Sequence, residues 1–230
     1  MSYRIVLKDA SYSWEVRAGR VDALHHISLE FTCGIPYLIC GRSGSGKTTL
    51  GLLCGGLVKP ASGEVYFEGA NSDSRRVAVV FQFPETLFFE DSVRKEFQSI
   101  HGNQSDTVAA AWLTELGLDY SSLAERLPEK LSSAEGRLTA VALQLSREPN
   151  LLILDEPTIG LDAKHRNALL QCIRKWLTPE RMLIIVTHDL ALMRVFGGET
   201  CILNQGKLER RIRTDELMRN NSLLQQYELI

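Results

Sequence analysis

Long apolar runs are absent from this chain of 230 residues. No stretch approaches the roughly 18 consecutive apolar residues that a membrane-spanning helix requires. The first residues, MSYRIVLKDA, also lack the apolar segment of a secretory signal peptide. We therefore expect that, if the protein works at a membrane, another chain holds it there.

Cysteines are few, and positive charge is not concentrated in any long stretch. An odd number of cysteines without CxxC spacing argues against a disulfide framework or a metal site and favours buried thiols of a cytosolic protein; the five are Cys33, Cys40, Cys54, Cys172 and Cys201. The net charge is −2, and the densest basic run is Arg210, Arg211 and Arg213. We interpret this run as a solvated surface, and we expect no nucleic-acid partner.

Four near-continuous apolar segments indicate strands that are buried on both faces. They are PYLIC (36–40), RVAVVFQ (76–82), LLILDE (151–156) and MLIIVTH (182–188). Helical patterns such as DAKHRNALLQCIRKWL separate them, and this alternation predicts an α/β fold with a mostly parallel sheet. Near the N-terminus, Ile27, Leu29 and Phe31 alternate with polar residues, which predicts a half-buried antiparallel strand.

Residues 83–146 interrupt this alternation because they contain no strand candidate. Val108, Trp112, Leu113 and Leu116 share one face of a predicted helix, and Gly117 is placed to end it. We predict an α-helical subdomain inserted into the sheet domain, with residues 1–82 and 147–230 as the core. The chain of 230 residues is then a single domain.

The strongest motif is GRSGSGKT, which lies between a buried strand and an apolar helix. It fits GxxxxGK[ST], in which glycines let backbone N–H groups wrap phosphates and the following helix adds the positive end of its dipole. Lys47 would reach the β- and γ-phosphates, and the Thr48 hydroxyl would bind Mg²⁺. The motif predicts a P-loop NTPase (RecA-like) core whose nucleotide-binding residues are Gly41, Arg42, Ser43, Gly44, Ser45, Gly46, Lys47, Thr48 and Thr49.

Two carboxylates end the third apolar segment. Asp155 and Glu156 stand at the C-terminal end of a predicted strand, which is the edge where α/β proteins bind ligands. Asp155 is placed to hold Mg²⁺, directly or through water, and Glu156 to orient and deprotonate an attacking water. His188 ends the fourth segment, so we expect it at the same sheet edge and within reach of the γ-phosphate.

Taken in order, these motifs resemble those of the ATP-binding-cassette (ABC) ATPases over nearly the whole chain. The resemblance implies that Trp14 stacks on adenine, that Gln82 senses Mg²⁺ and the attacking water, and that His188 is a switch histidine. It also implies that Leu161 and Asp162 belong to a loop that crosses a dimer interface. On this resemblance the Mg²⁺ ligands are Thr48, Gln82 and Asp155, and the catalytic residues are Lys47, Gln82, Glu156 and His188.

The segment VVFQFPETLFFEDSVRKEF most resembles the ATPase subunits of energy-coupling-factor and cobalt-uptake transporters. That likeness implies an ATP hydrolase that works at the interface of a homo- or heterodimer and drives import by a separate integral membrane protein. It would lie peripherally on the cytoplasmic face of the cell membrane. Phe83, Leu87, Phe88 and Phe89 either line the docking groove for that membrane protein or form the core of the helical subdomain.

Two other functions stay open. A soluble ABC ATPase would act as a conformational switch in a non-transport complex. The short insertion argues against the DNA-repair members, and the single cassette argues against the translation members. The other possibility is a regulatory subunit that binds nucleotide without hydrolysing it, against which the intact Glu156 and His188 argue.

LSSAE, at residues 131–135, stands where the ABC family carries LSGGQ, the signature that contacts ATP held by the partner subunit. Ser132 is kept, whereas Ser133, Ala134 and Glu135 replace two glycines and a glutamine. Ser132 and Glu135 have capping-box spacing, so residues 133 and 134 are predicted to be helical, where side chains cause little backbone strain. Against that, the Ala134 methyl and the Glu135 carboxylate would lie close to a polyanion. The segment is thus a tolerated but weakened signature, or an inactive one in an asymmetric heterodimer.

Overall fold

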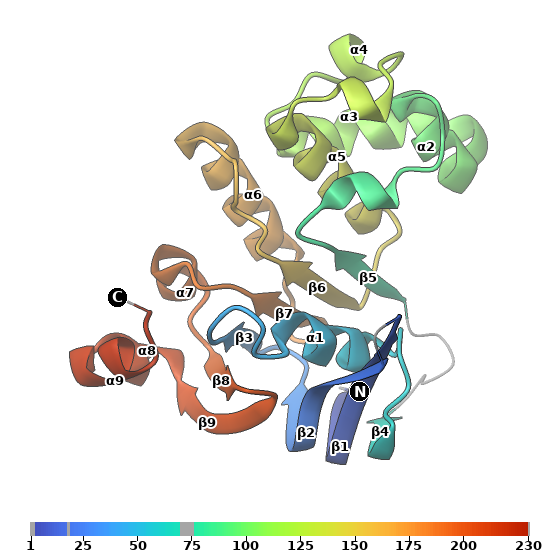
Figure 1. The fold of residues 1–230 in the computed structure, drawn as a ribbon. Helices are drawn as coiled ribbons and strands as arrows, with labels where there is room; N and C mark the ends of the chain where they lie inside the picture. The colour runs from blue at the N-terminus through green and yellow to red at the C-terminus, as the bar shows by residue number, and fades with distance from the viewer. Residues whose placement is uncertain (1–2, 18, 70–75, 230) are drawn as a thin grey trace. The chain divides into compact units, whose positions relative to one another are not determined.

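The structure, a computed structural model, describes residues 3–17, 19–69 and 76–229 (Figure 1). The chain divides into two compact units. Unit 1 comprises Met1–Val77, Asn150–Ile153 and Thr178–Ile230, and unit 2 comprises Ala78–Pro149 and Leu154–Leu177. The helical subdomain expected at 83–146 stays a prediction as far as its boundaries are concerned.

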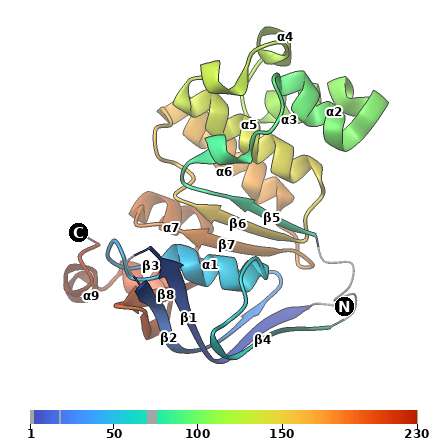
Figure 2. The same cartoon turned by 45° about the vertical axis from the view of Figure 1, so that its right-hand side comes forward.

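An antiparallel sheet of three strands forms the N-terminal part, in the order β2-β1-β4. The strands run side by side in Figures 1 and 2 and are β1 (Arg4–Val16), β2 (Gly19–Thr32) and β4 (Ser62–Glu68). In β2, Ile27, Leu29 and Phe31 are buried, whereas the intervening Ser28 is exposed. The predicted half-buried antiparallel strand is therefore confirmed.

A second sheet has the strand order β5-β6-β7-β3-β8-β9. Its strands are β3 (Pro36–Cys40), β5 (Val77–Val80), β6 (Leu151–Asp155), β7 (Met182–Val186), β8 (Glu199–Asn204) and β9 (Lys207–Arg213). β3 is parallel to both its neighbours, since Ile39 pairs with Val186 of β7 and with Cys201 of β8. The edge strand β9 is antiparallel to β8. All four apolar segments form strands, and the α/β fold predicted from them is confirmed.

The helices divide between the two units. Unit 1 contains α1 (Lys47–Gly55), α7 (Leu190–Phe196), α8 (Thr214–Met218) and α9 (Asn221–Gln226). Unit 2 contains α2 (Val93–His101), α3 (Ser105–Glu115), α4 (Tyr120–Leu123), α5 (Ser133–Ser146), α6 (Ala163–Trp176) and the 3₁₀ helices η2 (Pro84–Leu87), η3 (Gly102–Gln104) and η4 (Pro128–Lys130). In unit 2, α3 packs against α2 and α5, with Phe97, Leu113 and Leu138 fully buried. In unit 1, α1 packs against β7.

Across the described ranges, no helix has the length and apolar character needed to cross a membrane.

The cysteines are free thiols, as the sequence predicted. Cys33 is half-buried, and the other four are buried. Burial raises the pKa of Cys40 and of Cys201 to about 12, because a thiolate would lose its hydration inside the protein. These cysteines therefore behave as small apolar residues of the core rather than as reactive groups.

Candidate functional site

The glycine-rich loop joins β3 to α1 in unit 1, and two of its glycines are required by geometry. Gly41 has φ +140°, and a Cβ at this position would lie 2.0 Å from the carbonyl oxygen of Leu203. Gly46 has φ +96°, and a Cβ there would lie 2.5 Å from the carbonyl oxygen of Ala23. The loop is thus pressed against its own scaffold, where only glycine fits.

Lys47 begins α1 and folds back over the loop. Its Nζ donates hydrogen bonds of 2.8 Å to the carbonyl oxygens of Gly41 and Arg42. The N-cap residue is Gly46, which has no side chain to cap the helix, and no acidic residue lies in the first turn. The amides and the dipole at this end of α1, together with the ammonium group, make a cradle of positive potential that suits phosphate.

Trp14 reaches the first turn of α1 from strand β1. Its indole Nε1 donates to the Thr49 hydroxyl at 3.2 Å, and its ring packs edge-on against Tyr12 with 4.9 Å between ring centroids. The side chain remains 38% exposed. An aromatic face is therefore available beside the phosphate loop, where the family resemblance expects the adenine-stacking residue; that role stays a prediction.

His188 lies at the same sheet edge as the loop. Strand β7 is parallel to β3, and the amide of Thr187 donates to the carbonyl oxygen of Ile39 at 3.0 Å. His188 follows directly and is exposed, and Asp189 then caps α7 by accepting from the amides of Ala191 and Leu192. Because both strands end at one edge, His188 and the phosphate loop belong to the same surface of unit 1.

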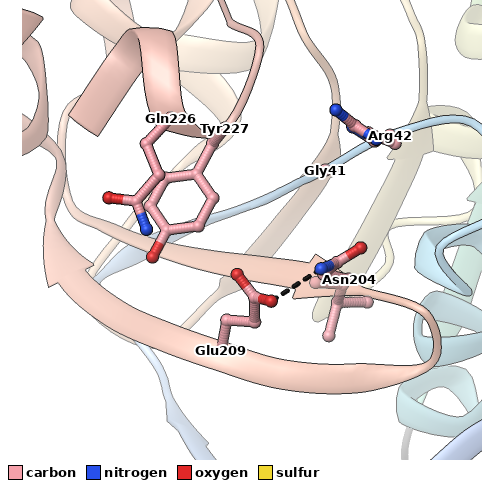
Figure 3. A pocket seen from close by; sticks show the side chains of 7 residues that line it. Gly41, Arg42, Asn204, Glu209, Gln226 and Tyr227 are labelled. Atoms are coloured by element: carbon pink, nitrogen blue, oxygen red, sulfur yellow. Dashed lines mark hydrogen bonds between the residues drawn. The ribbon is translucent and has the colours of Figure 1, made fainter. Parts of the chain in front are cut away.

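The C-terminus also returns to this loop, which sequence reasoning missed. A pocket of about 260 Å³ is lined by Gly41, Arg42, Leu203, Asn204, Glu209, Gln226 and Tyr227 (Figure 3). Within it the Asn204 amide donates to Glu209 at 2.6 Å. Arg42 of the loop forms an ion pair with Glu228, just beyond α9. No local signal predicts a contact between residues so far apart in the chain.

In unit 2, Asp155 and Glu156 form a buried acidic pair. Asp155 is the last residue of β6, Glu156 follows it, and their exposed fractions are 6% and 7%. Glu156 has φ +46°, a left-handed conformation that residues with a side chain adopt only when their surroundings hold it. Aspartate and glutamate are seldom buried, and these two stand at the end of a strand, where α/β proteins bind ligands, so their functional role stays a prediction.

Arg137 is a further residue of interest that was not predicted from the sequence. This buried arginine of α5 donates from Nη1 to the carbonyl oxygen of Glu156 at 3.2 Å and from Nη2 to that of Gln82 at 2.8 Å. Gln82 itself follows β5 and is half-buried. The available signal was an arginine followed by the nearly apolar helical stretch LTAVALQL, a position where a charge needs buried partners.

The LSSAE segment begins α5 with the predicted capping box. Ser132 is the N-cap; its Oγ accepts from the amide of Glu135, and Oε2 of Glu135 accepts from the amide of Ser132 at 2.7 Å. Arg126 donates to the other carboxylate oxygen at 3.0 Å. The Ser132 amide, and then Arg126, hold the pKa of Glu135 below its usual range. The negative charge of Glu135, which the sequence predicts to lie close to a polyanion, is thus already paired within unit 2.

The replaced glycines lie inside the first turn of α5. Ser133 and Ala134 are helical, as predicted, and neither has a positive φ. Ser133 is exposed, and its Oγ lies 3.2 Å from the point that a Cβ at Gly160 would occupy. Asp162, two residues further on, caps α6 by accepting from the amide of His165 at 2.8 Å. In unit 2 the signature therefore borders the loop that holds Asp162.

The apolar cluster after Gln82 is a surface rather than a core. Phe83 and Phe89 are 63% and 87% exposed, while Leu87 and Phe88 are half-buried. Buried Glu96 holds the segment by accepting from the amide of Phe89 at 2.5 Å and from that of Glu90 at 2.7 Å. Of the two alternatives drawn from the sequence, exposure at both ends of the segment favours a docking surface.

The sheet topology and the glycine-rich loop define a P-loop nucleotide-binding protein. Comparison with known protein families and relatives narrows this class. Residues 24–159 match the family described as ABC transporter. The energy-coupling factor transporter ATP-binding protein EcfA2 of Thermotoga maritima is 33% identical over 194 residues, which cover 80% of this chain and 73% of that protein. EcfA2 of Staphylococcus saprophyticus is 30% identical over 224 residues, covering 90% of this chain and 78% of that protein.

Solved structures agree with the fold. The ATP-binding cassette MJ0796, in a dimer bound to ADP and Pi, has a TM-score of 0.79 at 24% identity over 91% of this chain and 98% of its own. The cbiO1 protein of Clostridium perfringens, part of the ABC transporter complex cbiONQ, has a TM-score of 0.75 at 23% identity, covering 100% of this chain and 96% of its own. The chain belongs to the ABC transporter ATP-binding family, whose members hydrolyse ATP.

Proposed function

We propose that this chain is the ATP-hydrolysing subunit of an energy-coupling-factor-type importer, in which ATP closes two ATPase subunits and hydrolysis reopens them. The observation that carries this proposal is the buried acidic pair at the end of β6, in a chain whose phosphate loop is also intact. Likeness to two EcfA2 proteins along most of the chain supports the transporter role. The second ATPase subunit is a copy of this chain or a related one.

The phosphate loop binds the triphosphate. Backbone amides around Gly44 and Gly46 and the start of α1 face the β- and γ-phosphates, and Lys47 exchanges its two carbonyl partners for phosphate oxygens. The remaining loop residues, Arg42, Ser43, Ser45, Thr48 and Thr49, complete the cradle, and Trp14 stacks on the adenine.

Magnesium fits the donor atoms that the chain offers. Thr48, Gln82 and Asp155 supply hydroxyl, amide and carboxylate oxygens, which are the hard ligands that Mg²⁺ prefers, and ATP supplies phosphate oxygens. When bound, the ion would neutralise charge that develops on the phosphates. The buried carboxylate of Asp155 favours a cation for the same electrostatic reason.

Hydrolysis uses the side chains to which the family resemblance gives catalytic roles. Glu156 orients the attacking water and accepts its proton, and Gln82 helps to place that water. His188 donates to the γ-phosphate from the end of β7. Across the dimer, Ser132 and the amides of the first turn of α5 contact the partner's ATP, and the loop with Asp162 crosses the interface.

The membrane partner docks on the exposed segment that contains Phe83 and Phe89. Phe83, which follows Gln82 directly, and Phe89 in the same segment are both exposed and give an apolar anchor. The chain is then held peripherally at the cytoplasmic face of the membrane. The identity of the transported substrate depends on that partner.

The test of the transport role is copurification from detergent-solubilised native membranes, with every co-eluting chain identified by mass spectrometry. We expect an integral membrane protein and an ATPase subunit. In a Phe89→Ser variant we expect recovery of the membrane protein to fall while the ATPase dimer partner is retained. Recovery of soluble repair, translation or assembly proteins alone would instead place this chain in a non-transport complex.

Trp14 offers a test of nucleotide stacking. Trp14→Ala should weaken ATP binding by about 1–3 kcal/mol, the value of a base–aromatic contact, whereas Trp14→Phe should keep most of the affinity. The chain has three tryptophans, so a fluorescence change on ATP addition that disappears in Trp14→Phe belongs to Trp14. Equal affinities of the alanine variant and the unmodified protein would restrict Trp14 to a role in the fold.

A further inference from the structure

A buried guanidinium lies one turn into the helix that the signature begins. Arg137 is only 3% exposed, and its neighbours Leu138, Ala140 and Val141 on α5 are fully buried. A charge in such surroundings is costly unless hydrogen bonds replace its hydration. The hydrogen-bond partners of Arg137 therefore indicate the role of this buried guanidinium.

Two of those partners are main-chain carbonyls of residues with proposed roles in hydrolysis. Nη2 donates to the carbonyl oxygen of Gln82 at 2.8 Å, and Nη1 donates to that of Glu156 at 3.2 Å. The planar fork of an arginine can serve two acceptors at once, which the single ammonium of a lysine does with poorer geometry. One side chain thus joins α5 to two segments that lie 74 residues apart in the sequence.

The contact to Glu156 bears directly on its backbone. Glu156 has φ +46°, a conformation that needs support from the surroundings, and its carbonyl group belongs to the strained residue itself. A donor fixed on a helix restricts rotation of this carbonyl, and the orientation of the Glu156 carboxylate depends on that backbone. Arg137 does not touch the carboxylate, so its action is through the main chain.

We propose that Arg137 is a positioning residue for ATP hydrolysis, which locks the main chains of Gln82 and Glu156 to the helix that carries the signature. This inference rests on the proposed function, because it assumes that Glu156 is the general base. Residues Ser132–Glu135 form the start of the same helix. A displacement of the signature on contact with the partner's ATP is therefore passed to the water-activating residue and to the glutamine.

The test compares Arg137→Gln and Arg137→Lys with the unmodified protein, each in the intact native complex. Loss of the fork should lower turnover at saturating ATP by roughly ten- to hundredfold, because small misplacements of a catalytic group have effects of this size. The KM for ATP and the binding of ATP to the isolated subunit should change less than about threefold, since neither carbonyl belongs to the phosphate loop. The turnover of Arg137→Lys should lie between that of Arg137→Gln and that of the unmodified protein.

Val141→Ala is the matched control for a loss of packing. Val141 is fully buried and lies one turn after Arg137 on the same helix, with no part in the proposed chemistry. The Val141→Ala variant should have a lower unfolding temperature than the unmodified protein, while its turnover in the folded state should be unchanged. The inference is overturned if Arg137→Gln keeps turnover within twofold of the unmodified protein, or if its loss matches that of Val141→Ala. If Glu156→Gln also hydrolyses ATP normally, Glu156 is not the general base, and it is this part of the proposed function that has failed.

Discussion

Glu156→Gln is expected to lower steady-state ATP turnover by about 10²–10⁴-fold while ATP binding is kept. Glutamine preserves the shape of the side chain but cannot accept a proton from the attacking water. The main-chain bond from Arg137 to residue 156 remains possible, because it involves the carbonyl oxygen only. The variant should therefore fold and bind like the unmodified protein and fail in the chemical step.

The measurement is phosphate release at saturating ATP, together with analysis of the nucleotide that stays bound. We expect intact ATP on Glu156→Gln and mostly ADP on the unmodified protein. Glu129→Gln, an exposed carboxylate in η4, is the matched control and should leave turnover within twofold. A turnover of Glu156→Gln close to that of the unmodified protein would assign the general base to another residue.

Ser132→Arg is expected to reduce ATP hydrolysis by the assembled complex to less than about one tenth, if the signature works. The substitution puts a bulky side chain where the partner's γ-phosphate should lie and removes an N-cap, which by itself costs about 1 kcal/mol of helix stability. Ser132→Thr keeps a capping hydroxyl and serves as the control for the loss of the cap. Glu135 should not oppose phosphate strongly, because the Ser132 amide and Arg126 already pair its carboxylate.

The opposite test introduces the two glycines that the family signature carries at positions 133 and 134. Ser133→Gly combined with Ala134→Gly should raise turnover by up to about fivefold, because one charge-assisted contact gains at most about 3 kcal/mol and two helical glycines cost about 2 kcal/mol together. If both the double-glycine variant and Ser132→Arg match the unmodified protein, this signature is inactive. Hydrolysis would then occur only where Lys47 and Glu156 of this chain face a partner's signature.

The features that the sequence predicted depend on local patterns. The apolar segments 36–40, 151–156 and 182–188 formed β3, β6 and β7, because continuous burial on both faces needs no long-range information. The capping box at Ser132 was also readable, since it depends on residues three positions apart. The same holds for the glycine-rich loop, where the order strand, loop and helix is fixed by neighbours in the chain.

The features that the sequence did not predict join distant segments. The contact of Arg137 with Gln82 and Glu156 requires three segments to meet, and the pairing of Arg42 with Glu228 joins the loop to the other end of the chain. The exposure of Phe89 was left open, because an apolar run beside a helix is equally typical of a core and of a docking surface. The exposure of Phe83 and Phe89 in the folded unit favours the second of these alternatives.

ATP is expected to pair two ATPase subunits around the sites that hydrolyse it. The most direct measurement is light scattering of the isolated Glu156→Gln subunit, alone and mixed with any second ATPase subunit that copurifies with it. MgATP should produce a two-subunit species, and ADP should not. If the measured mass stays that of a single subunit in every mixture while ATP is bound, ATP does not pair the subunits and the proposed mechanism is wrong.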